Sequence, residues 1–201
     1  MAFTPVERMQ IKNVIERVLH VPGNYSGGTL EMAMVFDCNL PKEFSRQMGK
    51  DIATLLKSHS EVFRNVRLNG IRWEEDEVFI KELTSLPLLQ MGRYFDTYEC
   101  VERRKKLELL MEQLKKFYAR SKVILLFTDG NYVIENDEIY KANMHPFLYR
   151  KLIVIQCCNQ SGLQKEVASA DTGEEGIEDV VSWKLELHTG TELLKMSGTN
   201  I

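Results

Sequence analysis

A short run of apolar residues closed by a turn constrains the fold of this chain more than any other feature. Residues 123–127 are five consecutive apolar residues, and Thr128-Asp129-Gly130 ends the run. Such a run is typical of a strand that is buried on both faces, and strands of that kind belong to parallel sheets covered by helices. Ligands of open parallel sheets bind outside the carboxyl ends of the strands. Asp129 is therefore expected where a ligand or a metal would bind.

Helical and strand-like segments alternate along the chain. Helices are expected over residues 4–20, 42–59, 101–120 and 137–145, and strands over residues 29–38, 78–83, 123–127, 151–158 and 180–188. This order predicts an α/β fold with a mostly parallel, doubly wound, Rossmann-like sheet and helices on both faces. The 201 residues fit a single domain overall, with an N-terminal helix and loop over residues 1–28 and the α/β domain over residues 29–201.

Three further segments have a less regular pattern, and each is interpreted separately. Asn69-Gly70 is interpreted as a hairpin turn, because both residue types tolerate positive φ. Residues 85–100, with Pro87 and Gly92, are interpreted as a loop that carries Thr97. The five charged residues 102–106 are interpreted as the solvated face of the helix over 101–120 rather than as a nucleic-acid patch.

Composition excludes several classes of function. The formal net charge of -3 does not favour binding to a phosphate backbone, so no nucleic-acid partner is expected. No apolar stretch approaches the roughly 20 residues that span a membrane, and the first ten residues lack the apolar core of a signal peptide. We expect a cytoplasmic protein with no membrane contact. The cysteines have no zinc-type spacing, and Cys157 and Cys158 are expected to be inert core thiols rather than a nucleophile served by His188.

Polar residues follow two of the expected core strands. Asp37-Cys38-Asn39 ends the first strand, and Asp129 ends a later one. Two carboxylates at the carboxyl edge of one sheet would meet there, and such hard oxygen ligands suit Mg²⁺ or Mn²⁺. The alternative is that both residues only cap the helices that follow them.

The motifs FDCNLP and VILLFTDG resemble the two anchor motifs of the von Willebrand factor A (vWA) family. That family has Asp-x-Ser-x-Ser after its first strand, a loop threonine, and an aspartate in a Thr-Asp-Gly or Ser-Asp-Gly turn, which together form a metal-ion-dependent adhesion site. The resemblance covers about residues 29–158. It implies that the metal ligands are Asp37, Asn39, Thr97 and Asp129.

The resemblance implies a degenerate site. Pro41 stands where the family has its second serine, and proline offers no side-chain oxygen, so Mg²⁺ is expected to bind weakly or not at all. The implied function is a non-enzymatic protein-binding module whose partner is another protein. Two alternatives remain open, namely a metal-assisted hydrolase or phosphotransfer enzyme that uses Asp37 and Asp129, and a structural subunit of a larger complex. No glycine-rich phosphate motif supports nucleotide binding.

Overall fold

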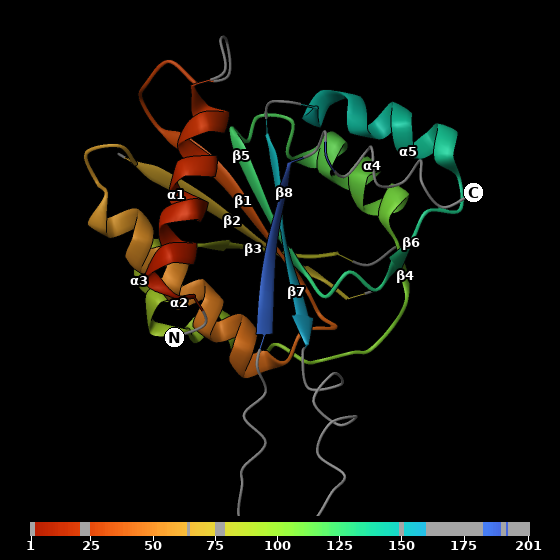
Figure 1. Cartoon of the computed structure of the whole chain (residues 1–201), viewed down its shortest axis with the longest axis horizontal. Helices are drawn as coiled ribbons and strands as arrows, with labels where there is room; N and C mark the ends of the chain where they lie inside the picture. Colours follow the sequence, from red (N-terminus) through yellow and green to blue (C-terminus); the bar gives the residue numbers. More distant parts are fainter. Residues whose placement is uncertain are drawn as a thin grey trace, which may run out of the picture.

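A six-stranded sheet lies between two layers of helices (Figure 1). The computed structural model describes residues 3–20, 25–63, 65–74, 79–148, 151–159, 183–189 and 192. The strands are β1 (Leu30–Asp37), β2 (Val66–Trp73), β3 (Phe79–Thr84), β4 (Lys105–Lys106), β5 (Val123–Thr128), β6 (Tyr132–Val133), β7 (Leu152–Asn159) and β8 (Trp183–Thr189). The helices are α1 (Pro5–Leu19), α2 (Lys42–Ser58), α3 (Leu86–Met91), α4 (Leu107–Phe117) and α5 (Asp137–Met144), with short 3-10 turns η1 (Arg93–Phe95) and η2 (His145–Phe147).

The strand order confirms the predicted fold class. The large sheet has the order β3-β2-β1-β5-β7-β8, while β4 and β6 form a small parallel pair of their own. β2, β1, β5 and β7 run parallel, and the edge strands β3 and β8 are antiparallel to their neighbours. β2 lies on one side of β1, and β5, which comes later in the chain, lies on the other side of β1. The strand order therefore reverses between β1 and β5, where open α/β sheets bind ligands.

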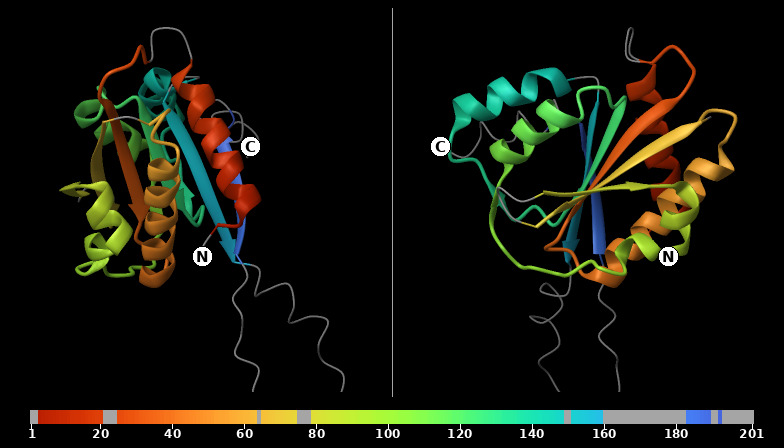
Figure 2. Two further views of the ribbon diagram at one scale, coloured as in Figure 1. Left: turned by 90° about the vertical axis from the view of Figure 1, so that its left-hand side faces the viewer. Right: turned by 180° about the vertical axis from the view of Figure 1, so that it is seen from behind.

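Alternate side chains of the central strands pack into two separate hydrophobic cores, one on each face of the sheet. On β1, Met34 and Phe36 belong to the core that includes buried residues of α1 and α2, whereas Ala33 and Val35 belong to the core under α4 and α5. Figure 2 shows these helices on opposite faces of the twisted sheet. Because Ile11 and Ile15 of α1 are buried in the first core, the N-terminal helix packs against the same sheet as the rest of the domain.

The predicted hairpin turn at Asn69-Gly70 is wrong, because both residues lie inside β2. A Cβ atom on Gly70 would lie 2.6 Å from Cε2 of Tyr94, which is closer than real Cβ atoms approach a neighbour. The glycine is thus needed for close packing of an aromatic ring against the strand, and not for a turn.

Residues 85–100 are not the continuous loop that we predicted. The Ser85 side chain accepts a hydrogen bond from the backbone N–H of Leu88 (3.4 Å) and caps α3. Gly92 ends this helix in the left-handed conformation with φ of 77°, which favours glycine. The short 3-10 turn η1 follows directly.

The predicted helix over residues 101–120 begins only at Leu107. Residues 101–104 have no regular structure, and Lys105–Lys106 form β4. Residues 102–104 are exposed, as the interpretation of a solvated face expects, but residues 102–106 do not lie on a helix. Lys105 contradicts the interpretation in burial as well, since it is 1% exposed.

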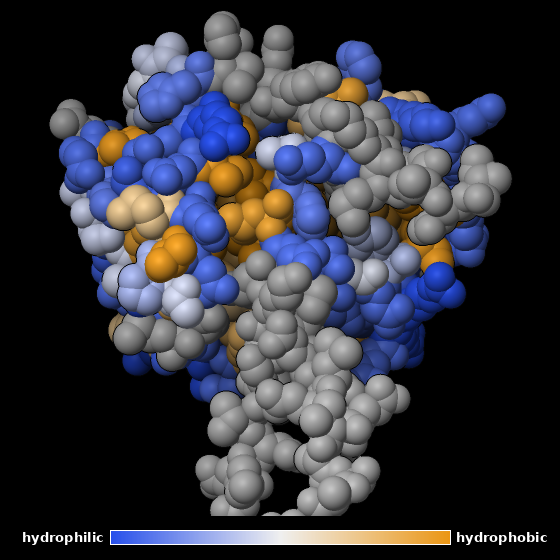
Figure 3. Space-filling view, in the orientation of Figure 1, coloured by the Kyte–Doolittle hydropathy of each residue, from blue (hydrophilic) through white to orange (hydrophobic). Residues whose placement is uncertain are grey.

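The end of the chain is described only in part. The expected last strand is present as β8. The sequence also predicts a loop over residues 161–179, which is rich in Gly, Glu, Ser and Asp, and a pairing of residues 193–196 with the last strand, and both segments lie outside the described residues. No helix among the described residues is long and apolar enough to cross a membrane. Figure 3 shows apolar side chains gathered at the centre of the face that carries α1.

Candidate functional site at the strand tips

Asp37 ends β1 with a carboxylate that is buried and engaged on both oxygens. Oδ1 accepts a hydrogen bond from the backbone N–H of Asn39 (3.0 Å) and contacts the ammonium group of Lys105. Oδ2 accepts a hydrogen bond from the hydroxyl of Thr128 at the end of β5 (2.7 Å). Burial raises the pKa of Asp37 above its ordinary value, although the Lys105 charge and the hydrogen bonds oppose this effect. The two central strands are thus tied together at their carboxyl ends.

Lys105 is the functional residue that sequence reasoning missed. Its Nζ forms an ion pair with Asp37, donates a hydrogen bond to the carbonyl of Trp73 at the end of β2 (2.9 Å), and lies 5.1 Å from the centre of the Trp73 ring. An ammonium group has three donor hydrogens and is almost never fully buried unless it is paired. One side chain therefore joins the ends of β1 and β2 beneath the surface.

Two backbone attachments place Lys105 at this position. The Asn39 side chain binds both backbone groups of Arg103, with Oδ1 accepting from its N–H (3.0 Å) and Nδ2 donating to its carbonyl (2.9 Å). Two residues earlier, the N–H of Val101 donates to the carbonyl of Cys38 (2.7 Å). Lys105 then pairs with Tyr132 of β6, just beyond the Thr128-Asp129-Gly130 turn. Residues 101–105 are therefore held across the carboxyl ends of β1 and β5.

Asp129 lies at the same edge, with Asn39 between it and Asp37. Asp129 Oδ1 accepts hydrogen bonds from the N–H of Asn131 (2.9 Å) and from Asn39 Nδ2 (3.4 Å). The turn that carries Asp129 depends on Gly130, which has φ of 84° and would place a Cβ atom 2.5 Å from Gln156 Nε2. Three of the four candidate ligands, Asp37, Asn39 and Asp129, are thus brought together at the strand tips.

The fourth candidate, Thr97, is engaged by a different partner. Arg72 Nη1 donates hydrogen bonds to the Thr97 carbonyl (2.7 Å) and to its hydroxyl oxygen (3.1 Å). These contacts fasten the segment after η1 to β2. The described contacts of Thr97 therefore give it a role in holding the chain, and none of them is to Asp37 or Asp129.

With Lys105 in place, the donor set at the tips does not fit a divalent metal. Within the described parts of the chain, no group of three or more His, Cys, Asp or Glu residues is arranged to hold a metal ion. Asn39 turns its NH₂ group toward Asp129, while its oxygen is bound to Arg103. A divalent ion on the Asp37 carboxylate would lie roughly 4 Å from the Lys105 ammonium, and at an effective dielectric constant of about 20 the repulsion would be about 8 kcal/mol. An ion would first have to displace the lysine.

The thiols and hydroxyls near Asp37 are not activated. Burial raises the pKa of the Cys38 thiol to about 12, so the thiol is neutral and a poor nucleophile near neutral pH. The buried Tyr98 hydroxyl donates a hydrogen bond to the Asp37 carbonyl (2.8 Å), and its pKa is also raised by burial. These groups brace the end of β1 and offer no general acid or base.

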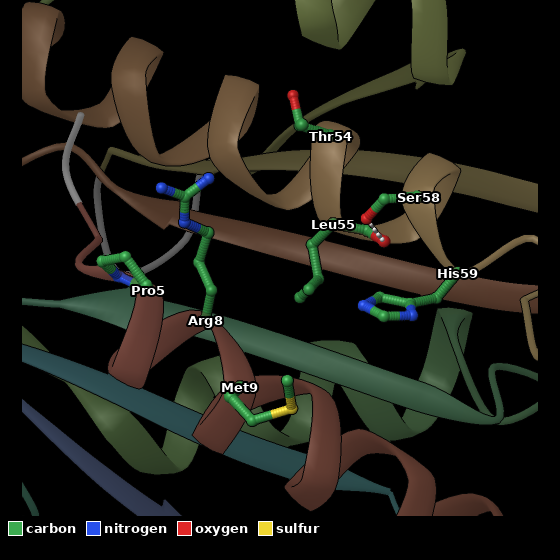
Figure 4. Close-up of a pocket in the computed structure, with 7 residues that line it drawn as sticks. All are labelled: Pro5, Arg8, Met9, Thr54, Leu55, Ser58 and His59. Atoms are coloured by element: carbon green, nitrogen blue, oxygen red, sulfur yellow. Dashed lines mark hydrogen bonds between the residues drawn. The ribbon is translucent and has the colours of Figure 1, made fainter.

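A pocket of about 310 Å³ lies between α1 and α2 (Figure 4). It is lined by Pro5, Arg8, Met9, Thr54, Leu55, Ser58 and His59. The hydroxyls of Thr54 and Ser58 donate to carbonyls of their own helix, at 2.9 Å and 3.0 Å, and His59 Nδ1 lies 3.3 Å from the Glu61 carboxylate. The polar groups of Thr54, Ser58 and His59 are thus satisfied locally, which does not favour a ligand site here.

Comparison with known proteins gives a distant structural likeness. No protein family profile matches the chain, and no curated protein is similar to it in sequence. The fold is similar to the crystal structure of an aerotolerance-related membrane protein from Bacteroides fragilis NCTC 9343 with multiple mutations to serines. The two share 11% identity over 84% of this chain and 88% of that chain, with a TM-score of 0.42. A likeness at that level says nothing about the site. The site is defined by the strand order and by the contacts of Asp37, Asn39, Lys105 and Asp129.

Proposed function

We propose that this chain is a non-enzymatic protein-binding module of the vWA type, and that it contacts another protein through the surface at the carboxyl ends of β1 and β5. In this proposal, Mg²⁺ binds weakly or not at all. The observation that carries the proposal is the buried ion pair between Asp37 and Lys105. A carboxylate that is engaged on both oxygens must break these contacts before it serves as a general base or a metal ligand. This argues against the metal-assisted enzyme that was the alternative.

The surface above this pair suits recognition of a protein. The segment over residues 99–104 exposes Glu99, Glu102, Arg103 and Arg104, so both signs of charge are presented close together. Its backbone is fixed to Asn39 and Cys38 beneath it. A surface that is already ordered loses less conformational entropy on binding, and arginine is enriched in protein interfaces.

The test compares two charge-reversed variants. In the tip variant, Arg103 and Arg104 are both replaced by Glu. In the matched control, Arg17 on α1 and Arg67 on β2 are both replaced by Glu, at the amino-terminal end of the sheet. Each immobilised chain is exposed to an extract of the source cells in EDTA or in Mg²⁺, and bound proteins are quantified by mass spectrometry.

We expect a specific protein to be retained equally in EDTA and Mg²⁺ by the parent and the control, and to be lost by the tip variant. Retention that requires Mg²⁺ would contradict the metal-independent part of the proposal. Retention that the tip variant keeps would show that the contact surface lies elsewhere on the molecule.

A further inference from the structure

The atoms around the Lys105 ammonium form the kind of cage that a cation needs. Oxygens of Asp37 and of the Trp73 backbone contact Nζ directly, and the Trp73 ring lies on one side. Thr128 Oγ1 reaches the other oxygen of the same carboxylate. Carboxylate, carbonyl and hydroxyl oxygens are also the ligands that small divalent cations take.

We propose that Lys105 is the resident cation of this site, built into the chain in place of a bound metal, and that removal of its side chain leaves a site for a small cation. This inference rests on the metal independence of the proposed function, but it does not depend on the protein partner. It assigns to a buried lysine the place in which the sequence resemblance had implied a magnesium ion.

A tethered cation has consequences that a bound ion does not. Because Lys105 is covalently part of the chain, the cation does not dissociate, and the occupancy of the site does not depend on the concentration of free metal. Residues 101–104 directly precede Lys105, and Asn39 binds the Arg103 backbone, so this segment stays packed over the strand tips. The tip surface is therefore held in one state at all metal concentrations.

The first test is chemical rescue of Lys105→Ala. The atoms that this substitution removes correspond to n-propylammonium. We expect the melting temperature of Lys105→Ala to rise in n-propylammonium chloride but not in n-propanol at equal concentration, because only the former restores the positive charge. The parent should not respond. Lys106→Ala is the matched control, because Lys106 is the next residue and pairs with Glu135 (2.8 Å) at the surface.

The second test measures binding of Mn²⁺ from the electron paramagnetic resonance signal of the free ion. We expect Lys105→Ala to bind Mn²⁺ more tightly than the parent by about tenfold or more, because the repulsion from the ammonium is gone. The parent and Lys106→Ala should bind Mn²⁺ equally poorly. Adding Asp37→Asn to Lys105→Ala should abolish the new binding, which places it at the strand tips.

Either of two results would overturn the proposal. One is Mn²⁺ binding by the parent that is lost in Asp37→Asn, and the other is a folded Lys105→Ala variant that responds to neither n-propylammonium nor Mn²⁺. If Lys105→Ala does not fold, Lys105→Met decides the question, because it keeps the apolar stem. A Met variant as stable as the parent would refute a need for the charge, whereas a loss that Asp37→Asn reverses would support it. All these measurements use the purified chain, so a failed search for a binding partner leaves their outcome unaffected.

Discussion

Replacing Asp37 by Asn should destabilise this protein more than its small change in size suggests. The substitution removes a negative charge and keeps the shape of the side chain. It leaves Lys105, which is 1% exposed, beside a neutral amide in place of the carboxylate, with the Trp73 carbonyl and ring as its other partners. Removing one partner of a buried ion pair costs about 3–5 kcal/mol, because the other charge stays buried without compensation. For a chain of this size, about 2–4 °C per kcal/mol gives a fall in melting temperature of roughly 6–20 °C.

An exposed pair of the same residue types provides the matched control. Asp137 and Lys141 form an ion pair one helical turn apart on α5, and both side chains are more than half exposed. Asp137→Asn should therefore cost less than about 1 kcal/mol, since exposed pairs contribute little. The comparison separates the effect of burial from the effect of losing a carboxylate.

The measurement is urea and thermal unfolding at pH 7 of the parent, the two single variants and Asp37→Asn/Lys105→Met. In the double variant neither position 37 nor position 105 carries a charge, so most of the lost stability should return. The reasoning would be refuted if Asp37→Asn cost no more than Asp137→Asn. It would also be refuted if the double variant showed the sum of two independent losses.

Four further predictions concern other residues. Asp129→Asn should leave the melting temperature nearly unchanged in both EDTA and Mg²⁺, whereas a metal-ligating Asp129 would give a Mg²⁺-dependent loss. Gly70→Ala should cost about 1–3 kcal/mol in urea unfolding through overpacking, and the cost should shrink in a Tyr94→Ala background, where the ring that the new Cβ meets is absent. Cys38 and Cys157 are buried and should resist iodoacetamide in the native protein, as peptide mass spectrometry would show. Because the pKa of Cys38 is raised from 9.0 to about 12 on folding, its contribution to stability is complete below pH 9 and falls as pH rises to 12. The slope should be about 1.4 kcal/mol per pH unit relative to Cys38→Ala.

Much of the fold could be predicted because the signals for it are local. The apolar runs of β1, β5 and β7 need no distant partner to be recognised. The start of α1 is equally local, since Thr4 and Glu7 cap each other within one turn, with the Thr4 N–H donating to the Glu7 carboxylate (2.7 Å). Gly70 shows the limit of this approach. Its turn propensity is overridden by the ring of Tyr94, which packs against it from another part of the chain.

The acidic residues of the candidate site could be predicted from the sequence, but its lysine could not. Asp37 and Asp129 are marked by the strands that they end, and their positions follow from the sheet. Lys105 carries no comparable signal, because it stands within five consecutive charged residues and such runs are usually solvated. Its burial depends on Asp37, which is 68 residues away in sequence. Periodicity within the charged run therefore could not separate Lys105 from its neighbours.

The pair of lysines in β4 explains why one particular residue of the run is buried. Successive side chains of a strand point to opposite sides, and here Lys105 turns inward to Asp37 while Lys106 pairs with Glu135 (2.8 Å). A shift of one residue would turn Lys106 inward and Lys105 outward, and it would break the two hydrogen bonds between Asn39 and the Arg103 backbone. Replacing both members of a buried ion pair by apolar residues is often neutral or stabilising, so the net stability of the pair does not account for its presence. We infer that the Asp37–Lys105 pair contributes chiefly to register, because it selects one of several chemically similar residues and thereby sets which side chains residues 101–104 present above the strand tips.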